Sequence, residues 1–351
     1  MIKCLAVVHQ GTEDTTQKEL VELGAADISV LEGAVLFSEQ DLKTLCSIAY
    51  QIRSATKIIW ILCSGKNILE EISKTELSIV KERTFAVESE ITEVGEAEIA
   101  EQIIEKTKNK VSLTTPDVLF YAGRFSQTIF FGVDLTGIDL GKRDYRIFLG
   151  PSNIKGTLAY SLLKTSGWNE TKTLLDPFCQ SGTVVIEAAL ASLQKPTAFH
   201  QKKNLAFVKL MEENIFSAVD NKIIPEKKLL IYAFDPHFKH ISATQKNAKI
   251  AEVNKCLQYS RQDIDWLDIK VEPDSIDCIV TCLPAERDLK KGDIPALFLR
   301  SKKIMKKNGT ITLLAKTKQQ EILDAGKDYT LKEHRTVWQG QSALSIMMFQ
   351  L

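Results

Sequence analysis

The stretch of sequence richest in chemistry runs from Leu174 to Ala189 and reads LLDPFCQSGTVVIEAA. Its pattern predicts an apolar strand that ends in Asp176, a turn of small residues, and a helix from Thr183. In an open α/β sheet such a turn lies at the carboxyl ends of the strands, where ligands bind. The free N–H groups of the helix amino terminus suit an anionic group, and the nearby carboxylate suits a cationic one. The methionine part of S-adenosylmethionine carries both charges and fits this corner.

Two more acidic residues follow predicted strands farther along the chain. Asp235 ends the strand at 229–234, where it can accept hydrogen bonds from ribose hydroxyls. Asp263 follows the strand at 257–261, where it can accept from an adenine amino group. An aspartate at the end of a strand also serves as a helix cap or turn residue. The order and spacing of the two after Asp176 favour a nucleoside ligand.

The elements around these residues predict an α/β fold with a doubly wound, Rossmann-like sheet. From about residue 151 strands and helices alternate, which is the pattern of a parallel sheet with helices on both faces. The predicted strands are 173–178, 229–234, 257–261, 276–282 and 310–315, and the predicted helices are 183–193, 240–251 and 294–305. The closing segments, 329–338 and 342–351, are typical of an antiparallel pair at a sheet edge.

The front of the chain predicts α+β structure. Residues 1–65 give strands at 2–8, 28–37 and 57–63 and helices at 12–23 and 41–52. Residues 66–150 give helical segments at 69–80 and 96–106, then a hairpin of 118–123 and 128–135 that turns through 124–127.

Composition sets limits on the function. The 351 residues carry 45 basic and 45 acidic side chains, so a nucleic-acid partner would need a local basic surface. The longest clear apolar run, 58–63, is far shorter than the roughly 20 residues of a membrane span, and the first residues lack a signal-peptide core. We expect a cytoplasmic protein that binds no membrane. The seven cysteines include no CxxC pair, so we expect neither a disulfide framework nor a metal site.

The string from Asp176 to Ala189 resembles the DPFCGSGT-x-x-IEAA motif of RNA methyltransferases with a Rossmann-like S-adenosylmethionine domain. The strings AVVHQGTE at 6–13 and RSATK at 53–57 resemble the ferredoxin-like amino-terminal domain of that family, and TPD at 115–117 and DLTGIDLGKRDYR at 134–146 resemble the end of a THUMP domain. The resemblance implies a ferredoxin-like domain at 1–65, a THUMP RNA-binding domain at 66–150 and a methyltransferase domain at 151–351. It also implies methylation of the exocyclic N2 of guanosine in tRNA or ribosomal RNA, with tRNA as the expected substrate and THUMP binding its acceptor end.

The same resemblance implies roles for individual residues. The methionine part of the cofactor would lie among Asp176, Phe178, Ser181, Gly182 and Thr183, the ribose at Asp235 and the adenine at Asp263. RNA contacts are expected at the exit of the THUMP domain, from Lys142, Arg143, Tyr145 and Arg146. One branch of the family works with a small zinc-binding activator protein, which is therefore a further expected partner.

A second basic stretch lies within 191–250, which holds ten lysines against five acidic residues, with Phe199 and Phe207 between them. Basic charge and aromatic rings suit an RNA backbone and unpaired bases. The same composition is also expected of an insertion whose lysines simply face the solvent.

The predicted catalytic residues, Cys282, Leu283 and Pro284, depart from the family pattern. The fourth strand ends in TCLPAE, which most resembles the TNLPYG form, so that Cys282 replaces an asparagine, Ala285 an aromatic and Glu286 a glycine. A thiol is a weak acceptor and alanine cannot stack on a base, although the backbone carbonyls of Cys282 and Leu283 are expected to stay available. Gln180 replaces the first glycine of the GSG turn.

These departures leave three hypotheses open. The chain is a guanosine-N2 methyltransferase that tolerates the changes, or a catalytically inactive tRNA-binding homologue, or an enzyme in which Cys282 attacks a pyrimidine with Glu286 as the acid.

Overall fold

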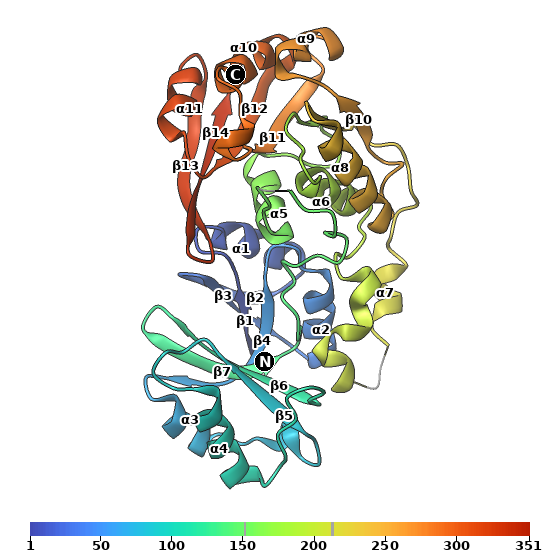
Figure 1. Ribbon diagram of the computed structural model, residues 1–351. Helices are drawn as coiled ribbons and strands as arrows, with labels where there is room; N and C mark the ends of the chain where they lie inside the picture. The colour runs from blue at the N-terminus through green and yellow to red at the C-terminus, as the bar shows by residue number, and fades with distance from the viewer. Residues whose placement is uncertain (151, 212–213) are drawn as a thin grey trace. The chain divides into compact units, whose positions relative to one another are not determined.

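The computed structural model describes residues 1–150, 152–211 and 214–351, and the chain divides into two compact units (Figure 1). Unit 1 consists of Met1–Leu140 together with Ala198–Asn221. Unit 2 consists of Gly141–Thr197 together with Lys222–Leu351. Each unit is built around its own seven-stranded sheet. All residues of the predicted cofactor site belong to unit 2.

The sheet of unit 1 is mixed and has the order β2-β3-β1-β4-β7-β6-β5. Its strands are β1 (Ile2–Val7), β2 (Ala26–Leu31), β3 (Ala34–Glu39), β4 (Lys57–Gly65), β5 (Phe85–Ser89), β6 (Val118–Phe125) and β7 (Thr128–Asp134). Its helices include α1 (Glu13–Glu22), α2 (Leu42–Gln51), α3 (Ile68–Lys74), η1 (Ser78–Val80) and α4 (Glu96–Thr107). Because β4 pairs with β7, the predicted ferredoxin-like and THUMP regions share one sheet, and their division at residue 65 stays a prediction.

One predicted strand of unit 1 was wrong. The segment 28–37 is not a single strand but parts of β2 and β3, which pair antiparallel through a tight turn at Glu32 and Gly33. Gly33 has φ of 77°, in the left-handed region that a hairpin turn requires and that glycine adopts without steric cost. The continuous apolar run hid this turn, because only one glycine marks it in the sequence.

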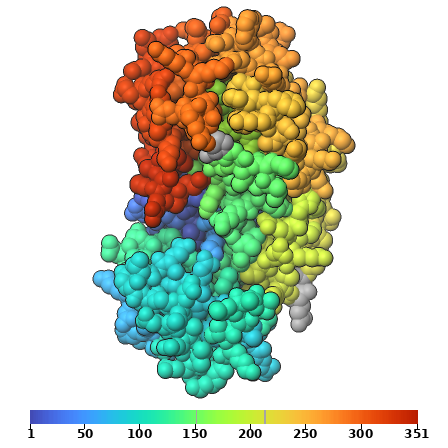
Figure 2. All heavy atoms as spheres, viewed as in Figure 1, coloured from blue at the N-terminus to red at the C-terminus, as the bar shows by residue number. Residues whose placement is uncertain are grey.

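A segment between α6 (Thr183–Ser192) and β9 (Ile231–Asp235) of unit 2 leaves that unit and completes unit 1. It holds η2 (Phe199–Asn204), η3 (Ala206–Lys209) and α7 (Phe216–Asp220), and Figure 2 shows it in yellow-green at the surface. Phe207 N donates to Leu135 O at 2.9 Å, and Tyr50 Oη donates to Asp220 Oδ1 at 2.8 Å. Five of its apolar side chains join the core of unit 1: Ala198, Leu205, Phe207, Ile215 and Val219. The segment is therefore part of the unit 1 core, which the sequence did not predict.

The doubly wound sheet predicted for the second half is confirmed, with the order β10-β9-β8-β11-β12-β14-β13. Its strands are β8 (Leu174–Asp176), β9 (Ile231–Asp235), β10 (Gln258–Arg261), β11 (Ile276–Cys282), β12 (Met305–Ala315), β13 (Thr330–Gln339) and β14 (Ser342–Gln350). The first five are parallel, and β13 and β14 form the predicted antiparallel pair. Strand order reverses between β8 and β11, so ligands are expected where these two strands end.

Helices cover both faces of this sheet (Figure 1). On one face α5 (Gly156–Thr165), α6 (Thr183–Ser192) and α8 (Phe238–Ile250) pack on one buried apolar cluster. On the other face η4 (Ile264–Trp266), α10 (Asp293–Ile304) and α11 (Gln319–Ala325) pack on a second cluster. Two short helices, α9 (Leu267–Lys270) and η5 (Glu286–Asp288), lie in the connections. The apolar strands are thus buried on both faces, as expected for a parallel sheet.

Candidate active site

The turn from β8 to α6 brings together the residues predicted to hold the methionine part of a cofactor. Asp176 ends β8 with only 1% of its surface exposed, and its Oδ1 accepts from Phe178 N at 3.2 Å. Gly182 has φ of 84°, and a Cβ there would lie 2.5 Å from Thr244 Cγ2. A glycine is therefore required for the backbone to enter α6 at Thr183.

Burial raises the pKa of Asp176 to about 8, with the nearby Asp235 carboxylate adding to the rise. An isolated carboxylate away from water favours its neutral form unless a cation comes close. An ammonium group would therefore find a buried partner here. The first N–H groups of the ten-residue helix α6 lie beside it and suit a carboxylate.

Asn153 and Asn247 hold the Ser181 part of this turn. Ser181 Oγ donates to Asn153 Oδ1 at 3.0 Å, and Asn247 Nδ2 donates to Ser181 O at 2.8 Å. Neither asparagine was singled out from the sequence, since both lie outside the motif. They order the turn from two other parts of unit 2.

Asp235 ends β9, as predicted, and is 1% exposed. Its carboxylate accepts three hydrogen bonds. The donors are Gln180 N at 3.1 Å, His237 N at 2.9 Å and the ring nitrogen Nδ1 of His240 at 2.9 Å. A carboxylate offers about four acceptor positions, so about one remains for a ribose hydroxyl. The oxygen of Asp235 and nitrogens of His237 and His240 also lie within 4.8 Å of one another, a spacing that a metal ion could use, although the sequence predicts no metal site.

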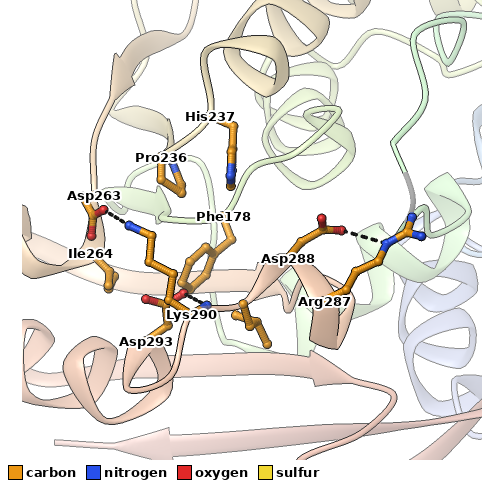
Figure 3. A pocket seen from close by; sticks show the side chains of 10 residues that line it. Phe178, Pro236, His237, Asp263, Ile264, Arg287, Asp288, Lys290 and Asp293 are labelled. Atoms are coloured by element: carbon orange, nitrogen blue, oxygen red, sulfur yellow. Dashed lines mark hydrogen bonds and ion pairs between the residues drawn. The ribbon is translucent and has the colours of Figure 1, made fainter.

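Asp263 lines a pocket of about 180 Å³ next to Asp235. Figure 3 shows Lys290 extending from the loop before α10 to form an ion pair with the Asp263 carboxylate. The hydrogen bond from Lys290 holds the pKa of Asp263 below its usual value. Phe178, Pro236 and His237 are among the other lining residues. The pocket thus has flat apolar and ring surfaces and three carboxylates, those of Asp263, Asp288 and Asp293, and Lys290 forms an ion pair with the first of them.

The predicted catalytic residues line a second pocket of about 340 Å³ at the end of β11. Cys282, Leu283 and Pro284 form one side of it, and Gln339 and Leu344 contribute from the β13–β14 pair. The cavity has the size and the mixed polar and apolar lining of a small-ligand site. Ala285 also lines this pocket, and its methyl group gives a base no aromatic surface on which to stack.

The Cys282 thiol is not activated. Burial, with the Asp176 carboxylate nearby, raises its pKa to about 12, so the thiol is neutral at physiological pH. The thiolate is the nucleophile of cysteine chemistry, and its absence argues against pyrimidine attack by Cys282.

One backbone acceptor expected to be available already accepts a hydrogen bond. Gln180 Nε2 donates to Cys282 O at 2.8 Å. We expected both the Cys282 and Leu283 carbonyls to stay available to a ligand. Because a carbonyl oxygen has two lone pairs, the Cys282 carbonyl keeps one acceptor position beside the glutamine side chain that reaches it from the β8–α6 turn. The glycine expected at position 180 has no such side chain.

Two of the four residues predicted to contact RNA are buried. Arg143 Nε donates to Glu187 Oε1 at 2.9 Å and Tyr145 Oη donates to the same oxygen at 2.8 Å, and neither side chain of the Arg143–Glu187 pair is exposed. Side chains that are buried in this contact are not available to RNA, so Arg143 and Tyr145 have a structural role. Lys142 is exposed and Arg146 is half-buried.

The aromatic rings of the 191–250 stretch also differ in exposure. Phe207 is 1% exposed and belongs to the core of unit 1. Phe199 is half-buried, with Lys202 Nζ 4.6 Å from its ring centroid. Phe207 is therefore not a base-stacking ring.

Residues 143–343 match the model of the RMKL-like methyltransferase domain, and residues 3–59 match that of the RlmL ferredoxin-like domain. The first match alone covers more than half of the chain. The chain belongs to the RMKL-like methyltransferase family. A tRNA (guanine(6)-N2)-methyltransferase of Methanocaldococcus jannaschii is 30% identical over 71% of this chain and 72% of the relative. A relative of the same name from Archaeoglobus fulgidus is 24% identical over 100% of this chain and 93% of its own length.

Other family relatives are longer. The ribosomal RNA large subunit methyltransferase K/L of Buchnera aphidicola is 28% identical over 75% of this chain, which spans only 42% of that protein. Among solved structures, TrmN from Thermus thermophilus superposes with a TM-score of 0.73 at 20% identity, over 100% of this chain and 99% of the other. The protein SMU.472, crystallised with S-adenosylhomocysteine, superposes with a TM-score of 0.79 at 19% identity, over 99% and 97%. The two superpositions show that this chain shares its fold with both solved structures over nearly its full length.

Proposed function

We propose that the protein transfers a methyl group from S-adenosylmethionine to the exocyclic N2 amine of a guanosine in tRNA. The observation that carries this proposal is the corner of unit 2 where buried Asp176 and the amino terminus of α6 lie beside the end of β11. The archaeal relatives, which are named for the same reaction on tRNA, support it.

The residues present fit the cofactor. When bound, S-adenosylmethionine supplies an electrophilic methyl group on its sulfonium. Asp176 would bind the ammonium group, with Phe178, Ser181, Gly182 and Thr183 around the methionine part. Asp235 has about one acceptor position for the ribose. Asp263 would accept from the adenine amino group in competition with Lys290.

The pocket at the end of β11 would hold the target base. A base inside a tRNA helix must leave its stack to reach such a pocket. Leu283 and Pro284 give it an apolar wall. In the reaction the amine nitrogen forms a bond to the methyl carbon, the carbon–sulfur bond breaks, and an amine proton leaves to water.

Contact with the RNA backbone is proposed for Lys142 and Arg146, the two of the four predicted RNA-contact residues that are not buried. Lysine and arginine near a phosphate backbone release counterions, so binding through them weakens as salt rises. We keep the acceptor end of tRNA as the expected binding region, from the resemblance of 66–150 to a THUMP domain.

The test is transfer of labelled methyl from S-adenosylmethionine to unmodified tRNA, followed by digestion to nucleosides. We expect labelled N2-methylguanosine from the native chain and none from Asp176→Ala. Tight tRNA binding without methyl transfer would instead favour the inactive tRNA-binding homologue, which the neutral Cys282 thiol and Ala285 motivate.

Two finer expectations stay predictions. The small zinc-binding activator protein would be shown unnecessary by methyl transfer from the isolated chain. A cytoplasmic location can be tested by fractionation. Within the described part of the chain, no helix combines the length and the apolar character that crossing a membrane requires.

A further inference from the structure

Gln180 occupies a backbone conformation that a side chain seldom adopts. Its φ is 50°, in the left-handed region, where a side chain on Cβ crowds the backbone and glycine is favoured. Ten described residues other than glycine have positive φ, and Gln180 alone among them is buried, with 6% of its surface exposed. The backbone is held on both sides, by Gln180 N to Asp235 Oδ2 and by Thr244 Oγ1 to Gln180 O. The other nine lie at exposed or half-exposed positions, where a turn alone accounts for them.

The side chain of Gln180 reaches the end of β11. Its contact with Cys282 O at 2.8 Å sets the orientation of the carboxamide, because a carbonyl oxygen accepts only from the NH₂ group. The carbonyl oxygen Oε1 is the other arm of the same planar group. It accepts no hydrogen bond from any residue that the structure describes. The amide oxygen is thus held close to Cys282 and has no hydrogen-bond donor among the described residues.

Two departures from the family motif therefore meet in space. Position 282 lacks the asparagine side chain expected there, and position 180 carries a carboxamide where glycine is expected. The Cys282 thiol is neutral and a weak acceptor, and Ala285 has no polar group. Gln180 thus brings to the end of β11, from the neighbouring turn, the same chemical group that position 282 has lost.

We propose that Gln180 Oε1 accepts a hydrogen bond from the amine that receives the methyl group, and so replaces the missing asparagine. This inference rests on the proposed function. An acceptor held in place before reaction orients the amine lone pair and stabilises the positive charge that develops on nitrogen as the new bond forms. The hydrogen bond to Cys282 O keeps the acceptor in position without rearrangement.

The first test compares four variants with the native chain in single-turnover methyl transfer to tRNA. Gln180→Met keeps the length of the side chain without the amide, and we expect a rate about ten- to a hundredfold lower. Gln180→Gly should lower the rate as much, and adding Cys282→Asn to Gln180→Gly should restore most of the rate.

Gln194→Met is the matched control, since Gln194 has a φ of 53° but is exposed. It should leave the rate unchanged. A faster Gln180→Gly enzyme would overturn the inference, because it would show that the side chain obstructs the site.

A binding measurement separates this inference from the proposed function. Sinefungin carries an amine where the transferred methyl lies, and S-adenosylhomocysteine carries nothing there. We expect Gln180→Met to weaken sinefungin binding about tenfold and to change S-adenosylhomocysteine binding by less than threefold, measured by calorimetry. Equal changes for the two ligands would overturn the role of Gln180 even if methyl transfer occurs. A selective loss for sinefungin in a chain that methylates no tRNA would support the acceptor and refute the proposed substrate.

Discussion

At the scale of single residues, Asp176 is the group whose environment has the clearest functional consequence. Burial raises the pKa of its carboxyl to about 8, so without a cation beside it the carboxyl is mostly neutral below that pH. A bound ammonium group favours the charged carboxylate and lowers that pKa. Cofactor binding below pH 8 must therefore release a proton.

We predict that affinity for S-adenosylmethionine rises as the pH increases from about 6 to about 8. Above this range affinity should fall, because the amino group of the cofactor loses its own proton with a pKa of roughly 7.7–8.0. Calorimetry in buffers of different ionisation heat would measure both the affinity and the proton release. Asp176→Asn should bind more weakly and lose the rising part of the profile. A rising limb that persists in Asp176→Asn would assign the titration to another group.

Lys290 gives a second prediction at this scale. It competes with adenine for the Asp263 carboxylate, and its side chain is 62% exposed. An exposed ion pair of this kind is worth about 0.2–1 kcal/mol, so we expect Lys290→Met to strengthen cofactor binding by a factor between about 1.4 and 5. The gain should shrink at high salt, which screens the ion pair. Weaker binding in Lys290→Met would show that the lysine contacts the cofactor.

The sequence located Asp176, Asp235 and the turn between β8 and α6 because a strand end, a small-residue turn and a helix start leave local signals. It did not reveal Lys290 or the reach of Gln180. Both depend on loops that are distant in sequence, and no local pattern records which side chain crosses between two strand ends.

At the scale of elements, Glu187 joins α6 to the segment that leads into α5. Arg143 and Tyr145 donate to it inside unit 2. Gly156, the first residue of α5, lies so close that a Cβ there would be 2.8 Å from Glu187 Oε1. The buried ion pair thus depends on close backbone packing as well as charge.

We predict that Glu187→Ala destabilises unit 2 by about 3–5 kcal/mol, since it leaves the Arg143 guanidinium buried without its partner. Urea unfolding followed by tryptophan fluorescence would measure the loss. Glu187→Gln, which keeps the size and one acceptor oxygen, should lose less. A loss below about 1 kcal/mol in Glu187→Ala would mean that water reaches the guanidinium.

Motif strings predicted the helix that carries Glu187 but not its partners. The KRDYR string was expected to face RNA because basic and aromatic residues are frequent in RNA contacts. The structure places alternate residues of that string inside the protein, since Arg143 and Tyr145 are buried while Lys142 is exposed. Composition cannot distinguish an RNA contact from a buried ion pair, because arginine and tyrosine serve in both.

At the scale of the whole molecule, the chain crosses between its two units three times, after Leu140, after Thr197 and after Asn221. The last two crossings enclose the segment that completes the core of unit 1. The division into domains was predicted as consecutive along the chain. A segment that returns to an earlier unit leaves no periodic signal, so alternation of strands and helices could not show it.

We predict that Phe207→Ala lowers the stability of unit 1 by about 3–5 kcal/mol, because the ring is buried in the core of that unit. In the sequence, Phe207 falls between segments that belong to unit 2. Trp60 is the one tryptophan of unit 1, so its fluorescence during urea unfolding reports on that unit. Phe199→Ala, at a half-buried ring of the same segment, is the matched control and should cost much less. Equal losses in the two variants would contradict the assignment of Phe207 to the core.

The central claim is that this family member methylates the N2 amine of a guanosine in tRNA. The most direct test uses two tRNA transcripts that are identical except that one carries inosine, which lacks the N2 amine, in place of the guanosine that the native chain is found to methylate. Incubation with labelled S-adenosylmethionine should incorporate methyl label into the guanosine transcript and none into the inosine transcript. Equal incorporation into both transcripts, or none into either, would contradict the claim.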